Sequence, residues 1–318
     1  MQSSEREQIV LNPRENIVVR TSNDAPTRET ICAVVVTRDP DVGLFSRVEK
    51  VRRQVDRTVL VDNGSGDLCI SRLRELATSP NVHLILNGAN QGVARALNQG
   101  IEYAEQQQYR WVLALDQDTT VAADMVDSLV AVYQEFPEKG RLAVIGSNYT
   151  NPVNGRPAAT HLPDAHSLGE EVKTVITSGS LISLNALDEI GGFRDDFFVD
   201  CVDLEYCLRA RSKGFRIALS SRPLMEHRIG NLREHLLPWK MTGTANHPPQ
   251  RQYFMTRNTV ILAREYFGRE PGWVFSTLWS RMKSLLLICL FEKERIQKLR
   301  NALMGTLDGV RKKTNRLV

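Results

Sequence analysis

Short apolar runs rich in β-branched residues alternate with helix-like segments through the first half of the chain. Each run has the continuous hydrophobic pattern of a strand that is buried on both faces. The runs cover residues 31–37, 58–62, 82–86, 110–115 and 142–146, and the helix-like segments cover about 42–55, 92–106 and 122–136. Strict alternation of this kind predicts an α/β fold with a mostly parallel central sheet flanked by helices.

The chain of 318 residues is long enough for one large α/β domain with an appendage, or for two small domains. We expect a flexible arm at 1–29 with a short strand at 17–19, a loop over the site at 150–172, and a last strand at 216–220. The five cysteines show no CxxC pair, and the start of the chain is polar. These features favour reduced thiols, no secretory signal and a cytoplasmic protein.

The net charge of +4 arises from the C-terminal residues 281–318, which contain ten Lys and Arg and three Asp and Glu. The rest of the chain is slightly acidic, which argues against a general nucleic-acid binder. The segment 273–291 contains Arg281 and Lys283, and its longest uninterrupted apolar run is too short to span a bilayer. In 296–310, apolar residues recur at helical spacing between basic ones. These helices either contact an anionic membrane surface or pack on the body or on a second subunit.

Two aspartates, Asp116 and Asp118, end the fourth apolar run in the sequence LALDQDTT. Alternate side chains of a strand lie on one face, so the two carboxylates converge on a small volume. Like charges held that closely need a cation or a shifted pKa, and a hard divalent ion such as Mg²⁺ or Mn²⁺ suits oxygen ligands. The alternative is a solvated turn that caps the next helix.

Other polar residues follow strands at what would be the same edge of a parallel sheet. Thr37 ends the first strand, and Asp62 and Asn63 end the second. Because such sheets bind ligands outside the carboxyl ends of their strands, the coincidence favours a shared site. No GxGxxG follows the first strand and no GxxxxGK[ST] occurs, so ordinary dinucleotide-binding and P-loop sites are disfavoured.

Three further features are candidates for ligand contacts. Asn90 and Gly92 precede a helix whose start could face a diphosphate. Arg95 is a candidate phosphate partner, with a surface ion pair as the alternative. Gly179 interrupts a strand-like run and allows the close approach of a ligand or of another chain.

The order of these motifs resembles that of family 2 glycosyltransferases with the GT-A fold, and most of all that of bacterial rhamnosyltransferases that use dTDP-L-rhamnose. The resemblance covers about residues 31–230. One departure is TRDP (37–40), where Arg38 stands in place of the tyrosine usual in the family. The matching pieces are VVVT in the first strand, VDNGS (61–65), NQGVARALNQG (90–100), LDQDT (115–119), TSGSLIS (177–183), GGF (191–193), FVDCVDLEYCLRARSKG (198–214) and His227.

The resemblance implies a nucleotide-sugar donor and a divalent metal, Mg²⁺ or Mn²⁺, that bridges the phosphates of the leaving group. It assigns Asp118 as the direct metal ligand, Asp116 to the ribose and the metal-bound waters, and His227 as a further ligand. A phosphate contact by protonated His227 is the alternative. Asp62 and Asn63 would contact the base and the ribose.

An inverting transfer needs one general base that takes the proton of the acceptor hydroxyl. Asp200, Asp203 and Glu205 are three acids within six residues. Matching the family's acidic pattern assigns the base to Asp203, places Glu205 at a second acid and puts Val202 where another acid is usual. Asp200 is the alternative base or an acceptor-binding residue, and a helix start enriched in acids is the alternative for the group. Arg209 would hold an acid in place or meet a phosphate.

We therefore expect a GT-A catalytic domain at 30–230 and an acceptor-side, helical, membrane-associating region at 231–318. The expected activity is transfer of L-rhamnose to a glycan or lipid-linked acceptor in cell-surface polysaccharide synthesis, including O-antigen, at the inner face of the cytoplasmic membrane. The open alternatives are a UDP-sugar donor (galactofuranosyl, glucosyl or N-acetylhexosaminyl transfer) and a non-catalytic binding module for nucleotide sugars or glycans. A homo-oligomer is a further open alternative.

Overall fold

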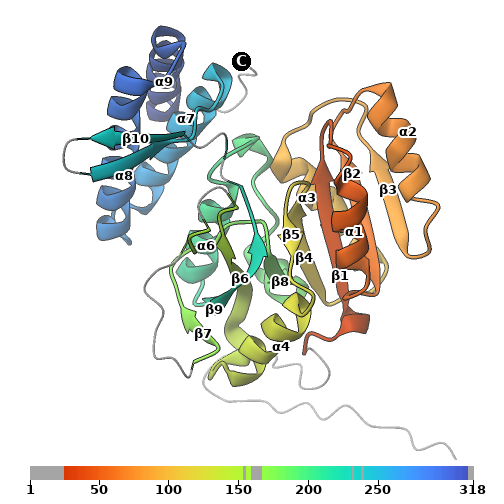
Figure 1. Cartoon of the computed structure of the whole chain (residues 1–318). Helices are drawn as coiled ribbons and strands as arrows, with labels where there is room; N and C mark the ends of the chain where they lie inside the picture. Colours follow the sequence, from red (N-terminus) through yellow and green to blue (C-terminus); the bar gives the residue numbers. More distant parts are fainter. Residues whose placement is uncertain are drawn as a thin grey trace, which may run out of the picture.

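The computed structural model describes residues 25–152, 155–158, 167–228, 230, 233–237 and 240–313. Within these residues, the centre is a nine-stranded sheet in the order β3-β2-β1-β4-β8-β6-β9-β5, with β7 paired to β9 (Figure 1). Its strands are β1 (Ile31–Thr37), β2 (Arg57–Asp62), β3 (Val82–Leu86), β4 (Trp111–Asp116), β5 (Thr120–Val121), β6 (Leu142–Thr150), β7 (Gly169–Glu171), β8 (Ser180–Ser183) and β9 (Arg216–Glu226). The helices around it are α1 (Leu44–Arg52), α2 (Asp67–Leu76), α3 (Val93–Gln106), α4 (Met125–Glu135), α5 (Leu184–Ile190) and α6 (Val202–Ser212).

The first four strands of the sheet order, β3, β2, β1 and β4, are parallel, as the alternating pattern predicts. In their register, Thr37 of β1 lies beside Asp62 of β2, and Val36 lies beside Asp116 of β4. The carboxyl ends of three strands therefore meet at one edge, which is where such sheets bind ligands.

The other half of the sheet is mixed, which differs from the expected mostly parallel arrangement. β8 runs antiparallel to both β4 and β6, whereas β6 and β9 are parallel to each other. The amino end of β8 consequently lies at the carboxyl end of β4, where the Gly179 N–H donates to the Ala114 carbonyl at 2.8 Å. A short apolar run has the same hydrophobic pattern in either direction, so the sequence does not reveal this reversal.

Helices cover both faces of the sheet because successive residues of β1 point to opposite sides. Cys32 and Val34 pack with buried residues of α3, α5, α6 and the later helix α7 (Pro249–Tyr266). Ile31, Ala33 and Val35 pack with buried residues of α1, α2 and α4. The strand ends that carry the candidate site residues are therefore held between two hydrophobic layers.

The chain ends in α7 (Pro249–Tyr266), α8 (Pro271–Phe291) and α9 (Arg295–Val310), which lie beside the sheet with the β10–β11 hairpin (Arg233–Leu237 and Lys240–Thr244) (Figure 1). α9 approaches α7 closely, because a Cβ atom on Gly305 would lie only 2.4 Å from the carbonyl oxygen of Tyr253. The Tyr253 hydroxyl donates to Asp308 at 3.0 Å. These contacts fix α7, whose first turn reaches the strand-end edge.

Several expected boundaries shift. The helix expected at 42–55 is the shorter α1, and the strand expected at 216–220 continues to Glu226. The expected arm at 1–29, including the strand at 17–19, lies outside the described residues apart from 25–29. The loop expected at 150–172 is described only in part, and it contains β7.

Candidate active site

A cavity of about 1040 Å³ opens at the strand-end edge of the sheet. Its wall combines the ends of β1, β2 and β4 with the loop before α6, the segment after β9 and the start of α7. A cavity of this size can hold a nucleotide-sized ligand. The lining includes Thr37, Arg38, Asn63, Asn90, Gly92, Asp116, Gln117, Asp118, Phe198, His227, Arg228, His247 and Arg251.

The turn that carries Asp116 and Asp118 is fixed by the residue between them. Gln117 accepts a hydrogen bond from the Arg38 N–H at 2.7 Å and donates one to the Arg38 carbonyl at 3.0 Å. Arg47 of α1 donates to the Gln117 carbonyl at 2.7 Å. The ends of β1 and β4 are thereby joined, and both aspartates line the cavity from a fixed turn.

Asp116, Asp118 and His227 form a group that could hold a metal ion, since one ligand atom from each lies within 4.8 Å of the others. Asp116 Oδ2 is 3.8 Å from His227 Nε2, and Asp118 Oδ1 is 3.7 Å from Nδ1. Two ligands of one Mg²⁺ ion, each about 2.1 Å from it, are at most about 4.2 Å apart, so small rotations suffice for a shared ion. Burial raises the pKa of Asp116; His227 opposes this shift and the charge of Asp118 adds to it. A bound cation would offset the repulsion between the two carboxylates, and the donor set therefore fits a divalent metal.

His227 is oriented by a short chain of hydroxyl groups. The Thr119 hydroxyl lies 3.1 Å from His227 Nδ1 and 2.6 Å from the Ser178 hydroxyl. Ser178 in turn accepts from the Asp116 N–H at 3.0 Å. When Nδ1 donates to Thr119, Nε2 is unprotonated, which is the state in which an imidazole nitrogen binds metal.

Asp62 and Asn63 have different surroundings at the end of β2. Asp62 is buried and accepts from the Thr37 hydroxyl at 3.1 Å, from the Ser65 N–H at 2.9 Å and from the Ser65 hydroxyl. Its carboxylate therefore closes the turn after β2, and it is not among the described residues that line the cavity. Thr37 and Asn63 do line the cavity, and Asn63 donates to Asn90 at 2.9 Å.

The start of α3 is less open to a ligand than the sequence suggests. Gly92 has a φ of 90°, and a Cβ atom there would lie 2.7 Å from the Phe198 carbonyl oxygen. The Gly92 N–H donates to the Asn90 side chain at 3.0 Å, and the Val93 N–H donates to the Phe198 carbonyl at 2.6 Å. Two N–H groups at the helix start are thus bonded within the protein, although Asn90 and Gly92 themselves line the cavity.

The loop before α6 has a strained backbone. Phe198, Asp200 and Cys201 have φ values of 60°, 65° and 60°, a region that costs non-glycine residues roughly 1–3 kcal/mol each. Asn258 of α7 holds the loop by donating to three carbonyl oxygens of the segment 197–200 at 2.8 to 2.9 Å. Strain that is held in place in this way is typical of functional loops.

Asp203 lies in the first turn of α6, directly after this loop. Its Oδ2 accepts from the Thr177 N–H at 3.2 Å, and its Oδ1 accepts from the Leu204 N–H at 2.8 Å. Burial raises the pKa of Asp203 to about 6 despite these hydrogen bonds, and the charges of Asp200 and Asp116 act in the same direction. Asp203 is partly exposed and close enough to Asp116 to feel its charge, although it is not among the described residues of the cavity wall.

Asp200 is bound by Arg251 of α7 through Nε and Nη2, with distances of 2.8 to 3.1 Å. Arg251 lines the cavity together with Asp116 and Asp118. Burial and the charge of Arg251 lower the pKa of His247, which also lines the cavity, to about 4. His247 is therefore a neutral polar group near pH 7.

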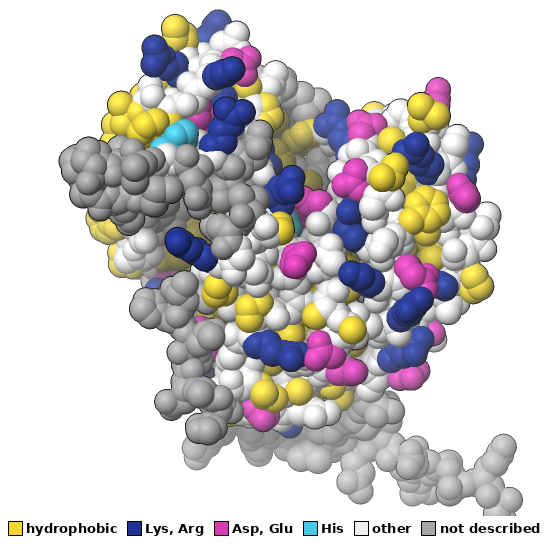
Figure 2. Space-filling model, in the orientation of Figure 1, with side chains coloured by type: hydrophobic (Ala, Val, Ile, Leu, Met, Phe, Trp, Pro, Cys, Tyr) yellow, Lys and Arg dark blue, Asp and Glu magenta, His cyan; other side chains and the backbone are white. Residues whose placement is uncertain are grey.

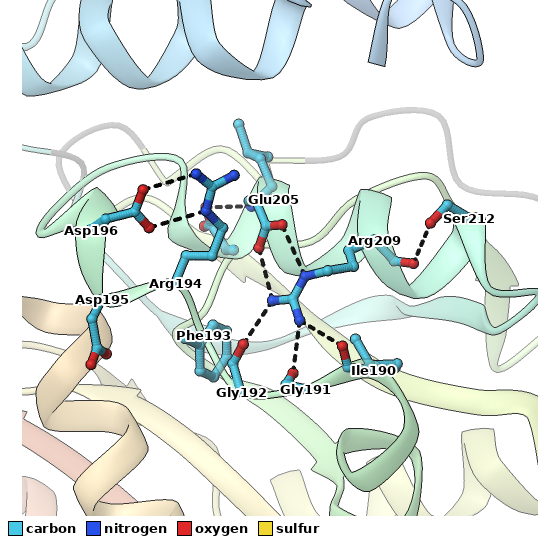
Figure 3. Close-up of polar contacts among 12 residues, drawn as sticks. Ile190, Gly191, Gly192, Phe193, Arg194, Asp195, Asp196, Glu205, Arg209 and Ser212 are labelled. Carbon is cyan, nitrogen blue, oxygen red and sulfur yellow. Dashed lines mark hydrogen bonds and ion pairs between the residues drawn. The ribbon is translucent and has the colours of Figure 1, made fainter. Parts of the chain in front are cut away.

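Glu205 and Arg209 lie apart from the cavity, which differs from the expected roles of Glu205 in catalysis and of Arg209 in substrate binding. Glu205 is 2% exposed, and its two oxygens accept from Nε and Nη2 of Arg209 at 2.9 Å each. The Arg209 guanidinium points at the carbonyl groups of Ile190, Gly191 and Gly192 (Figure 3). It donates to them at 2.7 to 3.0 Å. The pair joins α6 to the end of α5. Of the two roles expected for Arg209, the structure shows the first, because Arg209 holds an acid in place and does not line the cavity.

Arg95 and Gly179 are also outside the described cavity wall. Arg95 forms exposed ion pairs with Glu102 and Asp195, at 3.4 and 3.7 Å, as in the surface alternative. At Gly179, a Cβ atom would lie 2.5 Å from the sulfur of Met225, so the close approach is to β9 rather than to a ligand.

Residues 44–191 match the family model described as glycosyl transferase family 2. The chain carries a family 2 glycosyltransferase domain. It is 25% identical over 290 residues to the dTDP-rhamnosyl transferase RfbF of Shigella flexneri, covering 88% of this chain and 95% of that protein. It is 22% identical over 298 residues to the low-salt glycan biosynthesis hexosyltransferase Agl10 of Haloferax volcanii, covering 86% and 88%.

Solved structures show the same fold as this glycosyltransferase. The structure of S. aureus TarS 1–349 has a TM-score of 0.56 at 14% identity, covering 90% of this chain and 82% of that one. The mannosyltransferase PcManGT from Pyrobaculum calidifontis, in complex with GDP-Man and Mn²⁺, has a TM-score of 0.54 at 13% identity, covering 92% and 90%. The fold is therefore GT-A, as the sequence motifs predicted.

Some residues of this glycosyltransferase site were not singled out from the sequence. Two of them, Arg251 and Asn258, belong to α7, which lies outside the residues that match the family model. The others are the uncharged residues that orient the Asp116, Asp118 and His227 cluster, namely Gln117, Thr119 and Ser178. The segments TSGS and DQDT were recognised as motifs, but the contact between their hydroxyl groups depends on the reversed β8. Nothing in the sequence around Arg251 pairs it with Asp200.

Proposed function

We propose that this chain is an inverting, metal-dependent glycosyltransferase that transfers L-rhamnose from dTDP-L-rhamnose to a glycan or lipid-linked acceptor. The observation that carries the proposal is the Asp116, Asp118 and His227 cluster on a large cavity, with Asp203 and its raised pKa beside it. A relative named as a dTDP-rhamnosyl transferase supports the donor.

In this proposal, Asp118 and His227 would hold the metal together with Asp116, and Asp116 would also help to orient the ribose. The metal supplies charge neutralisation for the diphosphate that leaves. An imidazole among the ligands favours a transition ion such as Mn²⁺ over Mg²⁺. The structure of PcManGT with GDP-Man and Mn²⁺ is consistent with this preference.

Asp203 is proposed to act as the general base. The acceptor oxygen attacks the anomeric carbon from the side opposite the diphosphate, and its proton passes to the Asp203 carboxylate. The bond between the anomeric carbon and the phosphate oxygen breaks, and its electron pair leaves with dTDP. A pKa near 6 suits a base that works near neutral pH.

Arg251 is proposed to meet the diphosphate from the α7 side, and Asn63 and Thr37 to contact the nucleoside. Arg251 shares the cavity with the metal-binding pair, and a guanidinium matches phosphate oxygens in charge and geometry. Asp200, which Arg251 holds, is then an acid that positions this arginine; its expected role as an alternative base remains a second option.

The reaction is proposed to belong to cell-surface polysaccharide synthesis in the cytoplasm, at the inner face of the membrane. A second donor class calls for a direct comparison because the Haloferax volcanii relative is named a hexosyltransferase. UDP-glucose, UDP-galactofuranose and a UDP-N-acetylhexosamine are the competing donors.

Thermal shift with this panel of nucleotide sugars, with and without Mn²⁺, tests the proposal, since a ligand that binds the folded state raises its melting temperature. We expect the largest increase in melting temperature with dTDP-L-rhamnose and Mn²⁺. Asp118→Ala should lose this increase. The control variant Asp127→Ala, which changes an exposed acid on α4, should keep it. A larger increase in melting temperature with a UDP-sugar would mean that this UDP-sugar, and not dTDP-L-rhamnose, is the donor. Metal-dependent release of dTDP by the wild type, absent in Asp203→Asn, separates an enzyme from a binding module.

A further inference from the structure

The helix α8 presents a stripe of large hydrophobic side chains to solvent. Phe275, Trp279, Met282, Leu286 and Leu290 are 62%, 57%, 45%, 56% and 66% exposed. Steps of three and four residues keep these side chains on one face of a helix. α8 is long and apolar enough to cross a membrane by length and composition, and only 11% of its apolar stretch is buried in the protein.

The opposite face of α8 is anchored to the protein by an arginine. Arg281 is 9% exposed and donates to the Gln252 side chain at 2.6 Å and to the Thr256 hydroxyl at 2.8 and 3.1 Å. Val274 and Ile288 are buried on the same side. A spanning α8 would have to give up these contacts and place Arg281 within the hydrocarbon.

One basic residue of α8, the exposed Lys283, borders the exposed stripe, since Arg281 lies on the buried face. Lys283 lies one residue after Met282, and its ammonium is 6.0 Å from the centre of the Trp279 ring. α8 contains Arg281 and Lys283 and no acidic residue. Tryptophan and lysine together are typical of a helix that lies at the boundary between lipid headgroups and acyl chains.

The neighbouring α9 repeats the pattern. Ile296, Leu303, Leu307 and Val310 are 79%, 61%, 47% and 55% exposed at helical spacing, and the exposed Arg300 lies three residues before Leu303. In Figure 2, hydrophobic side chains and Lys or Arg side chains gather at the upper left, where Figure 1 places the C-terminal helices.

We propose that the exposed stripe of α8 lies in the plane of an anionic lipid surface, with Trp279 and Lys283 at the headgroup level and Arg281 still bound to α7. A second copy of the chain is a poorer occupant, because pairing two α8 stripes would bring together surfaces that carry lysine and no acid. Only the biological role of this lipid contact rests on the proposed function, because the enzyme would reach a lipid-linked acceptor at that surface. Lipid binding itself does not require transfer.

Flotation of the full chain with phosphatidylcholine vesicles, with and without one third phosphatidylglycerol, tests this proposal. We expect the wild type to float with the anionic vesicles, and Leu286→Gln/Leu290→Gln to reduce the floating fraction roughly fivefold or more. Lys283→Gln should weaken binding only to anionic vesicles. The matched control is Val42→Gln/Leu68→Gln, which changes two hydrophobic residues that are 75% and 79% exposed far from α8 in the sequence.

Equal flotation of the stripe variant and the wild type would overturn the proposal. So would a lipid-free dimer in sedimentation velocity that Leu286→Gln/Leu290→Gln dissociates, because the stripe would then join two copies. Resistance of the bound protein to alkaline carbonate extraction would favour a spanning helix instead of one in the membrane plane. Nucleotide-sugar binding measured on the same variants keeps these outcomes separate from a failure of the proposed function.

Discussion

Arg251 at the start of α7 holds Asp200 in the loop before α6 through three hydrogen bonds. The Asp200 side chain is 12% exposed, whereas that of Arg251 is 41% exposed. Burial lowers the pKa of Arg251, but its hydrogen bonds to Asp200 and the charges of Asp200, Asp116 and Asp118 raise it above its ordinary value. Among the described residues, Nη1 of Arg251 makes no hydrogen bond, so one end of the guanidinium is available to a ligand in the cavity.

Arg251→Ala should lower kcat/KM for the nucleotide sugar about 100-fold, because a charge-assisted contact to the departing diphosphate is lost. It should also destabilise the fold by about 1–3 kcal/mol, because Asp200 is left largely buried without its partner. The double variant Asp200→Asn/Arg251→Ala should recover stability in urea without recovering kcat/KM. Recovery of both would mean that Arg251 acts only through Asp200.

Transfer by the wild type should increase as the pH rises through about 6, because Asp203 can accept a proton only when it is ionised. Asp203→Asn should abolish transfer while the dissociation constant of the donor changes little. The measurements are initial rates at saturating donor from pH 5 to 8 and donor titrations at one pH. Near-normal turnover by Asp203→Asn would remove it as the base.

The same carboxyl group should make stability depend on pH. The pKa of Asp203 is about 6 in the folded protein, against about 3.9 in an unfolded chain, so the folded state holds the proton more tightly. Its stabilising contribution is complete below the unfolded value and is lost as the pH rises through about 6. Asp203→Asn, which cannot ionise, should therefore gain up to about 3 kcal/mol relative to the wild type at pH 8, and much less at pH 4.

Thr119→Val should weaken Mn²⁺ binding about 10-fold, because the hydroxyl that orients His227 through Nδ1 is replaced by a methyl group. Thr119→Ser should restore most of the affinity. Thr120→Val is a control at the next position of the chain. Titration of free Mn²⁺ followed by electron paramagnetic resonance measures the change without any need for an acceptor. Unchanged affinity in Thr119→Val would exclude this positioning role.

The parallel half of the sheet was predictable because its signals are local. Apolar runs mark the strands, and the residues just after them, such as Asn63 and Asp116, must lie at their carboxyl ends. The register that sets Val36 beside Asp116 then brings them to one edge without further information. The Asp116 and Asp118 pair was found in this way, and His227, which the family resemblance implied, lies 3.7 to 3.8 Å from their carboxylate oxygens.

Features of the site that depend on contacts between distant segments could not be predicted. Arg251 meets Asp200 only because α7 packs against the strained loop before α6, and sequence spacing carries no trace of that contact. Glu205 is different, because a local signal was present. An acid followed four residues later by an arginine on a helix is typical of an ion pair, which is what Glu205 and Arg209 form.

Arg209→Ala should therefore reduce stability rather than chemistry. It leaves Glu205, which is 2% exposed, without its partner, and it removes the donors to the carbonyl groups at the end of α5. We expect a loss of about 3–5 kcal/mol in the free energy of unfolding, measured by urea denaturation. Arg211→Ala removes two ion pairs of 3.4 Å from the same helix, whose side chains are 20% to 41% exposed, and it should cost less than about 1 kcal/mol. At a temperature where Arg209→Ala remains folded, its kcat should stay within a few-fold of the wild type. A 100-fold lower kcat in a fully folded Arg209→Ala protein would instead mean that the Glu205–Arg209 pair takes part in the reaction.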